Sequence, residues 1–269
     1  MIKKQWNRIK YVLVLCVLLL VLFHISYFLE FIFYELLNIP YDSVFAKIMV
    51  IVMHAAVFMV VIVVGLKDQR KTLASICFFK KVNAGVWCVA LMCSIGYTFF
   101  SYYIHSLFYS FKYGWYTDFG EQEGSFLFNL INTALIPAVA EELLFKGLIF
   151  TILKKYYSKI NAVIIASLMF AACHLSFIRI IPLFLLSCYT FWLYLRNGSL
   201  ILPMLLHFVN NLLPFVLINA PFSHIGTFYA AIILLIIGSY MLYMFSKPEQ
   251  KAQRGSSEDL NINEGRNKK

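Results

Sequence analysis

Residues 125–153 read SFLFNLINTALIPAVAEELLFKGLIFTIL, and this stretch decides the class of fold. A run of about 20 apolar residues is enough to cross the hydrocarbon layer of a bilayer, which is roughly 30 Å thick. This stretch is longer than that, yet its interior contains Glu141, Glu142 and Lys146. A charged side chain at the centre of a membrane costs at least about 2.5–3.5 kcal/mol on insertion scales, so these three residues require a structural or functional reason.

The rest of the sequence has the same apolar character. It is 61% hydrophobic and 13% charged, with a mean hydropathy of +0.77, whereas soluble domains carry about 25% charged residues. No soluble fold could hide this much apolar surface from water. We therefore expect an all-α fold, a polytopic transmembrane helix bundle that lies in the cell membrane with the lipid bilayer as its solvent.

Apolar runs predict about eight membrane spans. The first run follows a basic segment, as in a signal peptide, but it is too long and lacks a small-residue cleavage site, so we expect it to be a retained span. The predicted spans cover residues 11–34, 44–66, 83–105, 125–153, 160–178, 180–195, 199–219 and 225–245.

Basic residues indicate the orientation of these spans, because short cytoplasmic loops retain Lys and Arg during insertion. Of the 23 Lys and Arg residues, 19 lie in the N-terminal segment, in the even-numbered loops or beyond the last span, three (Lys47, Lys112 and Arg179) lie toward the opposite side, and Lys146 lies within a span. Both termini are therefore predicted to be cytoplasmic. We expect a transmembrane domain at residues 1–246 and a disordered cytoplasmic tail at 247–269, which is polar and has no aromatic residue.

The net charge of +10 does not indicate a nucleic-acid partner. The basic residues stand in short clusters between apolar runs, and no known nucleic-acid-binding module is recognisable, so we expect no nucleic acid to bind. The six cysteines are scattered, mostly inside apolar runs, and form no CxxC pair. They are expected to pack as small apolar residues, not to build a disulfide scaffold.

Two later spans also contain polar residues that are unusual in a membrane. Span 160–178 contains His174, and span 199–219 contains His207 and Asn211. Residues four apart lie on the same face of a helix, so Asn211 is predicted to lie beside His207. Asn210 is the alternative amide, but it does not share this alignment.

The same spacing applies to the first stretch. Glu142 is predicted to lie beside Lys146, whereas Glu141 points about 100° away from Glu142. The two carboxylates are therefore expected to have different roles. Counted from the basic residue at the cytoplasmic edge of each span, four polar residues lie about 16–22 Å inside: Glu141, His174, His207 and Asn211.

A carboxylate and an imidazole at one depth suit the activation of water. A Glu in a low-dielectric pocket can act as a general base at neutral pH, and an imidazole beside an amide can stabilise an oxyanion. Together such groups would hydrolyse an amide bond.

Three sequence blocks resemble the CPBP family of intramembrane proteases, which includes the eukaryotic prenyl-protein (CAAX) endopeptidase and the bacterial Abi proteins. The blocks are AEELLFKG at 140–147, FAACH at 170–174 and HFVNN at 207–211. The family pattern is EExxxR, then FxxxH, then HxxxN or HxxxD. The resemblance covers roughly residues 125–215, in the expected order.

The resemblance implies a role for each matching residue. Glu141 and His174 would activate the attacking water, Glu142 would support the site, and His207 with Asn211 would form the oxyanion hole. Two His and a Glu could also hold zinc with an open position, so the candidate metal ligands are Glu141, His174 and His207. Lys146 stands where the family has Arg, and an ammonium does not reproduce the bidentate pairing of a guanidinium.

These observations predict an intramembrane endopeptidase, a metalloendopeptidase if zinc is used, that cleaves a membrane-associated peptide or protein. Peptide maturation or bacteriocin self-immunity would be its role. One alternative is a non-proteolytic scaffold or immunity protein of the same fold, in which Glu141 and Glu142 form only a structural ion pair with Lys146. A transporter with a buried proton-relay carboxylate is another. His24 and His54 match no block and are predicted to make packing or interhelical contacts.

Overall fold

A computed structural model describes residues 2–40, 43–113, 125–216 and 224–245. Within these ranges all regular structure is helical, and each of the eight predicted spans contains a helix or a continuous helical run. The predicted tail at 247–269 lies outside the described residues. The long helices are α1 (Ile2–Leu36), α2 (Val44–Asp68), α3 (Ala84–Tyr113), α7 (Lys159–Cys173), α8 (Ile180–Asn197), α9 (Ile201–Val216) and α10 (His224–Phe245).

The stretch at 125–153 forms one continuous helical run, here called the central run, with two π-helical sections. It begins after Ser125, whose hydroxyl accepts a hydrogen bond from the backbone N–H of Phe128 at 3.4 Å. A Ser in this position satisfies one of the N–H groups that a helix leaves unpaired at its start. The sections are α4 (Phe126–Asn129), η2 (Leu130–Leu135, π), α5 (Ile136–Glu142), η3 (Leu143–Ile149, π) and α6 (Phe150–Leu153).

Among the residues that the structure describes, three helices are long and apolar enough to cross a membrane by length and composition. They include residues Gln5–Leu36 of α1, Val44–Asp68 of α2 and Ala84–Ile104 of α3. Shorter apolar helices occur at Lys159–Cys173, Ile201–Val216 and Phe228–Met241. The chain is therefore an all-helical membrane protein, while the total of eight spans and the cytoplasmic termini stay predictions.

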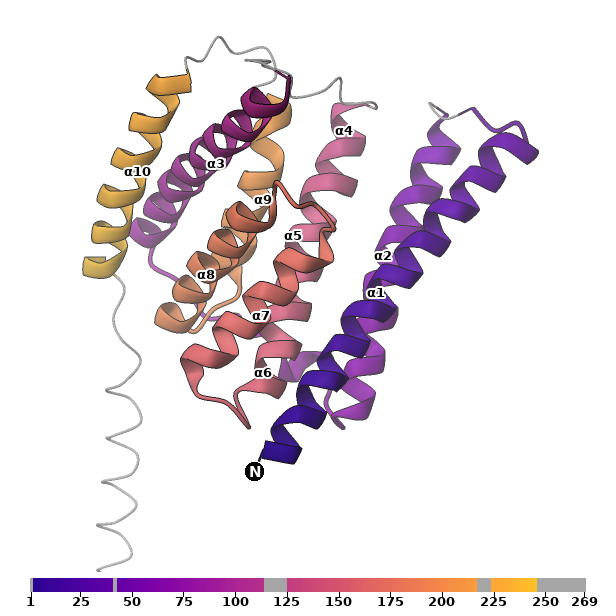
Figure 1. The fold of residues 1–269 in the computed structure, drawn as a ribbon, viewed down its shortest axis with the longest axis horizontal. Helices are drawn as coiled ribbons and strands as arrows, with labels where there is room; N and C mark the ends of the chain where they lie inside the picture. The colour runs from indigo at the N-terminus through magenta and orange to yellow at the C-terminus, as the bar shows by residue number, and fades with distance from the viewer. Residues whose placement is uncertain (1, 41–42, 114–124, 217–223, 246–269) are drawn as a thin grey trace, which may run out of the picture.

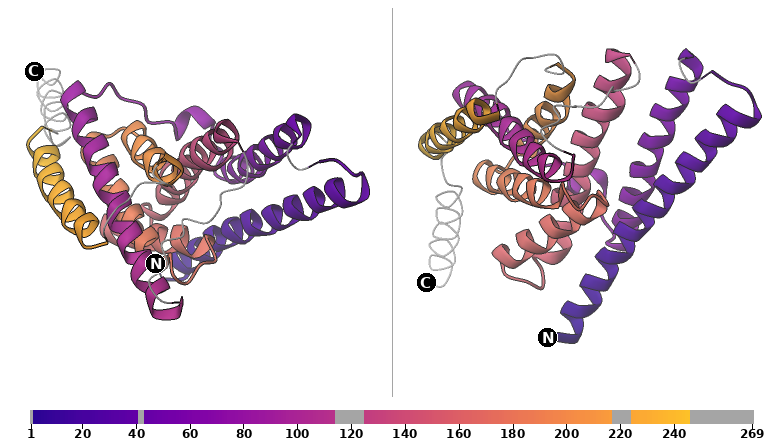
Figure 2. Two further views of the ribbon diagram at one scale, coloured as in Figure 1. Left: turned by 90° about the horizontal axis from the view of Figure 1, so that it is seen from above. Right: turned by 45° about the horizontal axis from the view of Figure 1, so that its top comes forward.

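The helices are arranged in three parts (Figures 1 and 2). The hairpin of α1 and α2 lies on one side, and α2 packs against the central run. The central run, α7, α8 and α9 form the middle. On the far side α3 packs against α9, and α10 covers α3. Three elements of the middle therefore supply the polar residues singled out in the sequence.

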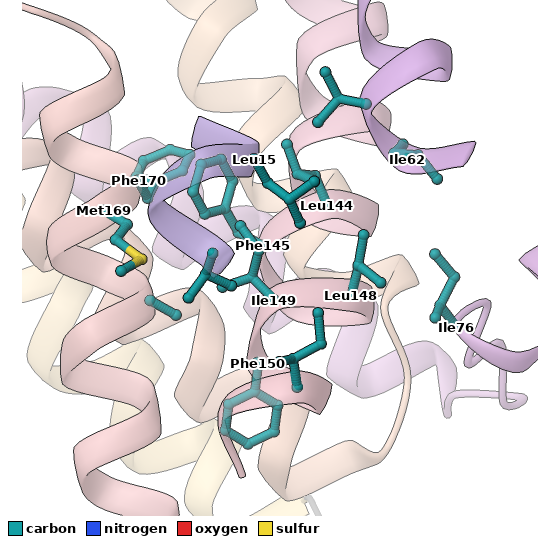
Figure 3. Close-up of a cluster of buried hydrophobic side chains, with 14 of the residues drawn as sticks. Leu15, Ile62, Ile76, Leu144, Phe145, Leu148, Ile149, Phe150, Met169 and Phe170 are labelled. Carbon is teal, nitrogen blue, oxygen red and sulfur yellow. The ribbon is translucent and has the colours of Figure 1, made fainter. Parts of the chain in front are cut away.

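The main core joins the hairpin to the middle of the molecule. Figure 3 shows Phe145 of the central run beside Phe170 of α7, and their rings meet edge to face at 5.3 Å between centroids. Leu15 of α1 is fully buried in the same cluster. Many apolar side chains on the outside of α1 and α2 are exposed, as expected of surfaces that face lipid.

The connection between α2 and α3 closes one end of this core. It contains the short 3₁₀ helix η1 (Leu73–Ser75) and the fully buried Ile76. A Cβ on Gly147 would stand 3.0 Å from the carbonyl oxygen of Ile76, so the glycine allows the central run to approach the backbone of this connection closely. Further along, the backbone N–H of Leu200 donates to the carbonyl of Phe78 at 2.7 Å. The connection is thereby fixed to the start of α9.

The packing of α10 on α3 depends on Gly96, which gives the first testable prediction. A Cβ on Gly96 would lie 2.7 Å from Leu234 Cβ and 3.3 Å from the backbone nitrogen of Leu235. We expect Gly96→Ala to lower the free energy of unfolding by about 1–3 kcal/mol, because the two backbones must move apart. Thermal unfolding in detergent measures the loss.

Gly85 is the matched control, because it also lies in α3 and a Cβ there would meet only Asn83 Oδ1, at 3.4 Å. Gly85→Ala should leave the unfolding midpoint unchanged or raise it slightly. Equal effects of the two substitutions would contradict the close approach of α3 and α10.

Candidate active site

The central run places Glu141 and Glu142 at the end of α5, directly before the π-helical η3. Pro137 lies near the start of α5, directly after the π-helical η2 and inside the continuous run, where it cannot donate a backbone hydrogen bond. π-Helical turns are frequent at functional sites, because they change the direction in which successive side chains point. The sequence pattern does not reveal these turns.

Glu142 is the centre of a buried ionic network. Lys146 Nζ lies 2.5 Å from Glu142 Oε2, and His207 Nδ1 lies 3.0 Å from Glu142 Oε1. The side chains of Lys146, Glu142 and His207 are only 0–2% exposed. The Lys146 ammonium also lies over the ring of Phe191, 4.6 Å from its centroid. Both oxygens of Glu142 are thus engaged, and the predicted pairing of Glu142 with Lys146 is confirmed.

Glu141 faces a different set of partners. Its Oε2 lies 3.8 Å from His207 Nε2 and 3.9 Å from His174 Nε2. The same oxygen is buried and forms no direct hydrogen bond among the described residues. Both distances exceed those of a direct hydrogen bond. Glu141 is therefore a carboxylate that faces two imidazoles without being held by either, unlike Glu142.

His174 lies at the end of α7, not inside a longer helix. The helix stops at Cys173, earlier than the predicted limit of 178, because Leu175 adopts a left-handed conformation with φ of 49° and turns the chain. His174 Nδ1 lies 2.9 Å from the carbonyl oxygen of Phe170. A carbonyl only accepts, so Nδ1 carries the proton in this contact and Nε2 is the atom presented to Glu141.

His207 comes from the buried face of α9 and is 2% exposed. Its two ring nitrogens face the two carboxylates, and its ring packs edge to face on Phe170 at 5.7 Å. The structure therefore brings together Glu141, Glu142, His174 and His207 from three separate elements, as the sequence blocks predict.

The two asparagines of α9 are placed differently. Asn210 Oδ1 lies 3.5 Å from the hydroxyl of Thr98 in α3, so this amide faces α3. Asn211 is half-buried one turn after His207. Its side chain forms no hydrogen bond within the described part of the chain, and its part in an oxyanion hole stays a prediction.

The predicted zinc ligands Glu141, His174 and His207 do not form a closed set of metal donors. In the described residues no three His, Cys, Asp or Glu side chains are placed so as to hold a metal ion together.

An open pocket of about 430 Å³ lies along α1 and reaches Leu175. Its lining consists of His24 and five apolar residues of α1, together with Leu175, which follows His174 in the chain. An apolar surface thus reaches to within one residue of a candidate catalytic side chain.

A second polar cluster confirms the prediction that His54 makes interhelical contacts, although its other members were not predicted. It joins Ser26 and Glu30 of α1 to His54 of α2 and Asn132 of the central run. Glu30, a carboxylate inside the apolar run at 11–34, is the residue of the sequence that could have indicated this cluster.

The network around Glu142 gives the second testable prediction. Lys146→Met removes the cation and leaves a buried carboxylate without its main compensation, which typically costs 3–5 kcal/mol. We expect a large fall in the unfolding midpoint in detergent. The double variant Lys146→Met with Glu142→Gln should recover part of the loss, because the unpaired charge is gone. A double variant no more stable than the single one would show that the pair is not coupled.

Comparison with known proteins agrees with the sequence blocks. Residues 123–213 match the family model described as type II CAAX prenyl endopeptidase Rce1-like. No curated protein and no solved structure matches the chain. The matched residues include both glutamates, both histidines and the amide of the site. Residues 123–213 of this membrane protein therefore form an Rce1-like type II CAAX prenyl endopeptidase domain, consistent with the CPBP family of proteases.

Proposed function

We propose that this chain is an intramembrane endopeptidase that hydrolyses a peptide bond in a membrane-associated peptide or protein. The observation that supports this most is the position of Glu141 Oε2, within 3.9 Å of the Nε2 atoms of both His174 and His207. A carboxylate that faces two imidazoles but is bonded to neither is able to take a proton from water.

Glu141 is the general base in this proposal, and Glu142 is not. Both oxygens of Glu142 are already engaged, one by Lys146 and the other by His207. An acceptor whose lone pairs are used in short contacts is a poor base for a third group. Glu142 instead orients His207 and keeps the positive charge of Lys146 inside the protein.

His174 positions the attacking water. Its Nδ1–H is held by the Phe170 carbonyl, so its Nε2 presents a lone pair on the side of Glu141. Water bound between these atoms would donate one proton to each acceptor and direct its own lone pair toward the scissile carbonyl. The Glu141 carboxylate takes the proton that is lost when the oxygen attacks carbon.

His207 stabilises the oxyanion that forms on the carbonyl oxygen. In its doubly protonated form it donates Nδ1–H to Glu142 and presents Nε2–H toward the reaction centre. The Asn211 amide, one turn further along α9, would supply a second donor. Removing one donor of an oxyanion hole typically lowers kcat by about 10²–10³.

The substrate reaches this site from the lipid side. The pocket between α1 and Leu175 is apolar, and it suits the apolar part of a membrane-associated substrate better than a polar peptide. Maturation of a membrane peptide or self-immunity to a bacteriocin would both use such a substrate.

The third testable prediction concerns Glu141 and His174. Glu141→Gln and His174→Gln should each lower the cleavage rate by at least about 10²-fold, because each change removes a proton acceptor from the reacting water. The measurement is mass spectrometry of new protein termini in membranes that contain the wild-type chain or a variant.

Glu35→Gln serves as the matched control, since it makes the same chemical change at an exposed position near the end of α1. It should leave the pattern of new termini unchanged. A cellular phenotype that survives both Glu141→Gln and His174→Gln would favour the scaffold or immunity role. The observation that favours the scaffold or immunity role is that Lys146 stands where the family has Arg.

A further inference from the structure

Basic side chains from three separate segments meet at one end of the helical bundle. The segments are the start of α1, the chain that follows α2 and the turn that follows α6, and Figure 1 shows all three at the same end of the molecule. Residues 1–10, 66–83 and 150–161 include twelve Lys or Arg residues and one acidic residue, Asp68. The proposed hydrolysis uses none of these charges.

Close packing of three elements fixes these segments relative to one another. A Cβ on Gly65 of α2 would meet the side chain of Leu148 in the central run and would stand 3.3 Å from Leu15 Cδ1 of α1. The glycine therefore lets α1, α2 and the central run approach at one point. Lys71 follows Gly65 by six residues, and Lys154 follows Leu148 by six residues. Both chains thus leave the packed core at the same end.

The end of α2 turns Lys71 back toward the bundle. Arg70 has a left-handed conformation with φ of 50°, and its N–H donates to the carbonyl of Lys67 at 3.1 Å. The N–H of Lys71 donates to the carbonyl of Leu66 at 2.9 Å. This pair of bonds is a Schellman motif, in which a left-handed residue ends the helix and the chain turns. Lys71 is half-buried as a result, whereas Lys67 and Arg70 are exposed.

The turn after α6 is fastened to the start of α1. The side-chain amide of Gln5 donates to the carbonyl of Tyr156 at 2.6 Å. The guanidinium of Arg8 lies over the ring of Tyr156, 5.3 Å from its centroid. Lys154 and Lys155 directly precede Tyr156 in the chain. These contacts therefore bring Arg8 to the turn that holds both lysines.

The residues that converge here are called the basic cluster: Arg8, Lys71, Lys154 and Lys155. Burial, and after it the ammonium groups of Lys155 and Lys154, lower the pKa of Lys71, so the three lysines lie close enough to repel one another. Among the described residues none of these three lysines forms an ion pair. An anion bound between them would relieve the repulsion.

The only acidic residue of the three segments does not neutralise the cluster. Asp68 Oδ2 accepts a hydrogen bond from the Gln69 side chain at 2.8 Å, and its carboxylate faces Tyr11 of α1. Retention of Lys and Arg in cytoplasmic loops explains the number of basic residues at this end. It does not require residues from three segments to converge, so the convergence needs a reason of its own.

We propose that the basic cluster binds the phosphate headgroup of an anionic phospholipid. Ammonium and guanidinium groups form charge-assisted hydrogen bonds with phosphate, and basic pockets between transmembrane helices hold such headgroups. This inference does not depend on the proposed hydrolysis.

The surface beside the cluster favours a lipid over a free phosphate ion. Val60, Val63 and Val64 on the outside of α2 are exposed, and Val64 lies roughly two helical turns before Lys71. An apolar surface therefore continues from the cluster into the lipid layer. The acyl chains of a bound phospholipid can lie on this surface, whereas a free phosphate ion would use the cations alone.

The test measures lipid binding by the full chain in a neutral detergent, with native mass spectrometry as the readout and dioleoyl phosphatidylglycerol as the probe. The double variant Lys71→Gln with Lys155→Gln should bind this lipid about 10–30-fold more weakly than the wild type, because two of the attracting cations are gone. Phosphatidylcholine with the same acyl chains should bind weakly to both proteins. Inorganic phosphate at the same concentration should not displace the anionic lipid.

Lys80→Gln with Lys81→Gln is the matched control, because it removes the same charge from the same connection at two exposed positions outside the cluster. It should bind phosphatidylglycerol as the wild type does. The proposal is overturned if the control loses as much affinity as the cluster variant, if the cluster variant binds as the wild type does, or if inorganic phosphate displaces the lipid. Displacement by hexaglutamate would make the cluster a docking surface for an acidic protein segment, and it would also reject the lipid.

Thermal unfolding keeps the test decisive if the double variant folds poorly. Lys71→Gln alone should raise the unfolding midpoint in neutral detergent, because it removes a repelling charge. Added phosphatidylglycerol should raise the wild-type midpoint by roughly 2–5 °C and should raise that of Lys71→Gln by less. The variant Lys71→Arg with Lys155→Arg keeps both charges and should respond to the lipid as the wild type does. An equal response of the wild type and Lys71→Gln would contradict the proposal.

Discussion

The burial of Glu142 is the constraint on which the rest of this structure depends. A carboxylate inside an apolar bundle is stable only if its charge is matched and its lone pairs are used. Lys146 supplies the charge from the next turn of the same helix, and His207 supplies a donor from α9. The central run and α9 must therefore keep one relative position. Because this position is fixed, Glu141 faces His174 and His207 and does not take part in the ion pair with Lys146.

Local backbone changes complete the site where helical periodicity alone would not. The π-helical η3 follows Glu142 directly, and α7 ends at Cys173 so that His174 caps it. Each change releases a side chain from the register of a regular helix. The histidine at the end of α7 is further fixed by the Phe170 carbonyl. The regular helices set how deep each residue lies in the bundle, and the irregular turns set the direction in which its side chain points.

Much of this arrangement could be predicted from the sequence, because charged residues in apolar runs are few and helical spacing is regular. The pairing of Glu142 with Lys146 follows from a separation of four residues, and the helix positions follow from hydropathy. Two features could not be predicted this way. The end of α7 depends on the left-handed conformation of Leu175, and a leucine at this position does not predict a turn. The polar cluster of Ser26, Glu30, His54 and Asn132 depends on which faces of three helices meet, and this is set by tertiary packing.

The link between the α2–α3 connection and α9 has a consequence for motion in the bilayer. The backbone bond from Leu200 to Phe78 and the buried Ile76 fasten the hairpin at the end where α2 leaves it. At that end the chain is held by the covalent connection, by a backbone hydrogen bond and by packing. Any displacement of the hairpin relative to the bundle is therefore restricted at residues 76–78.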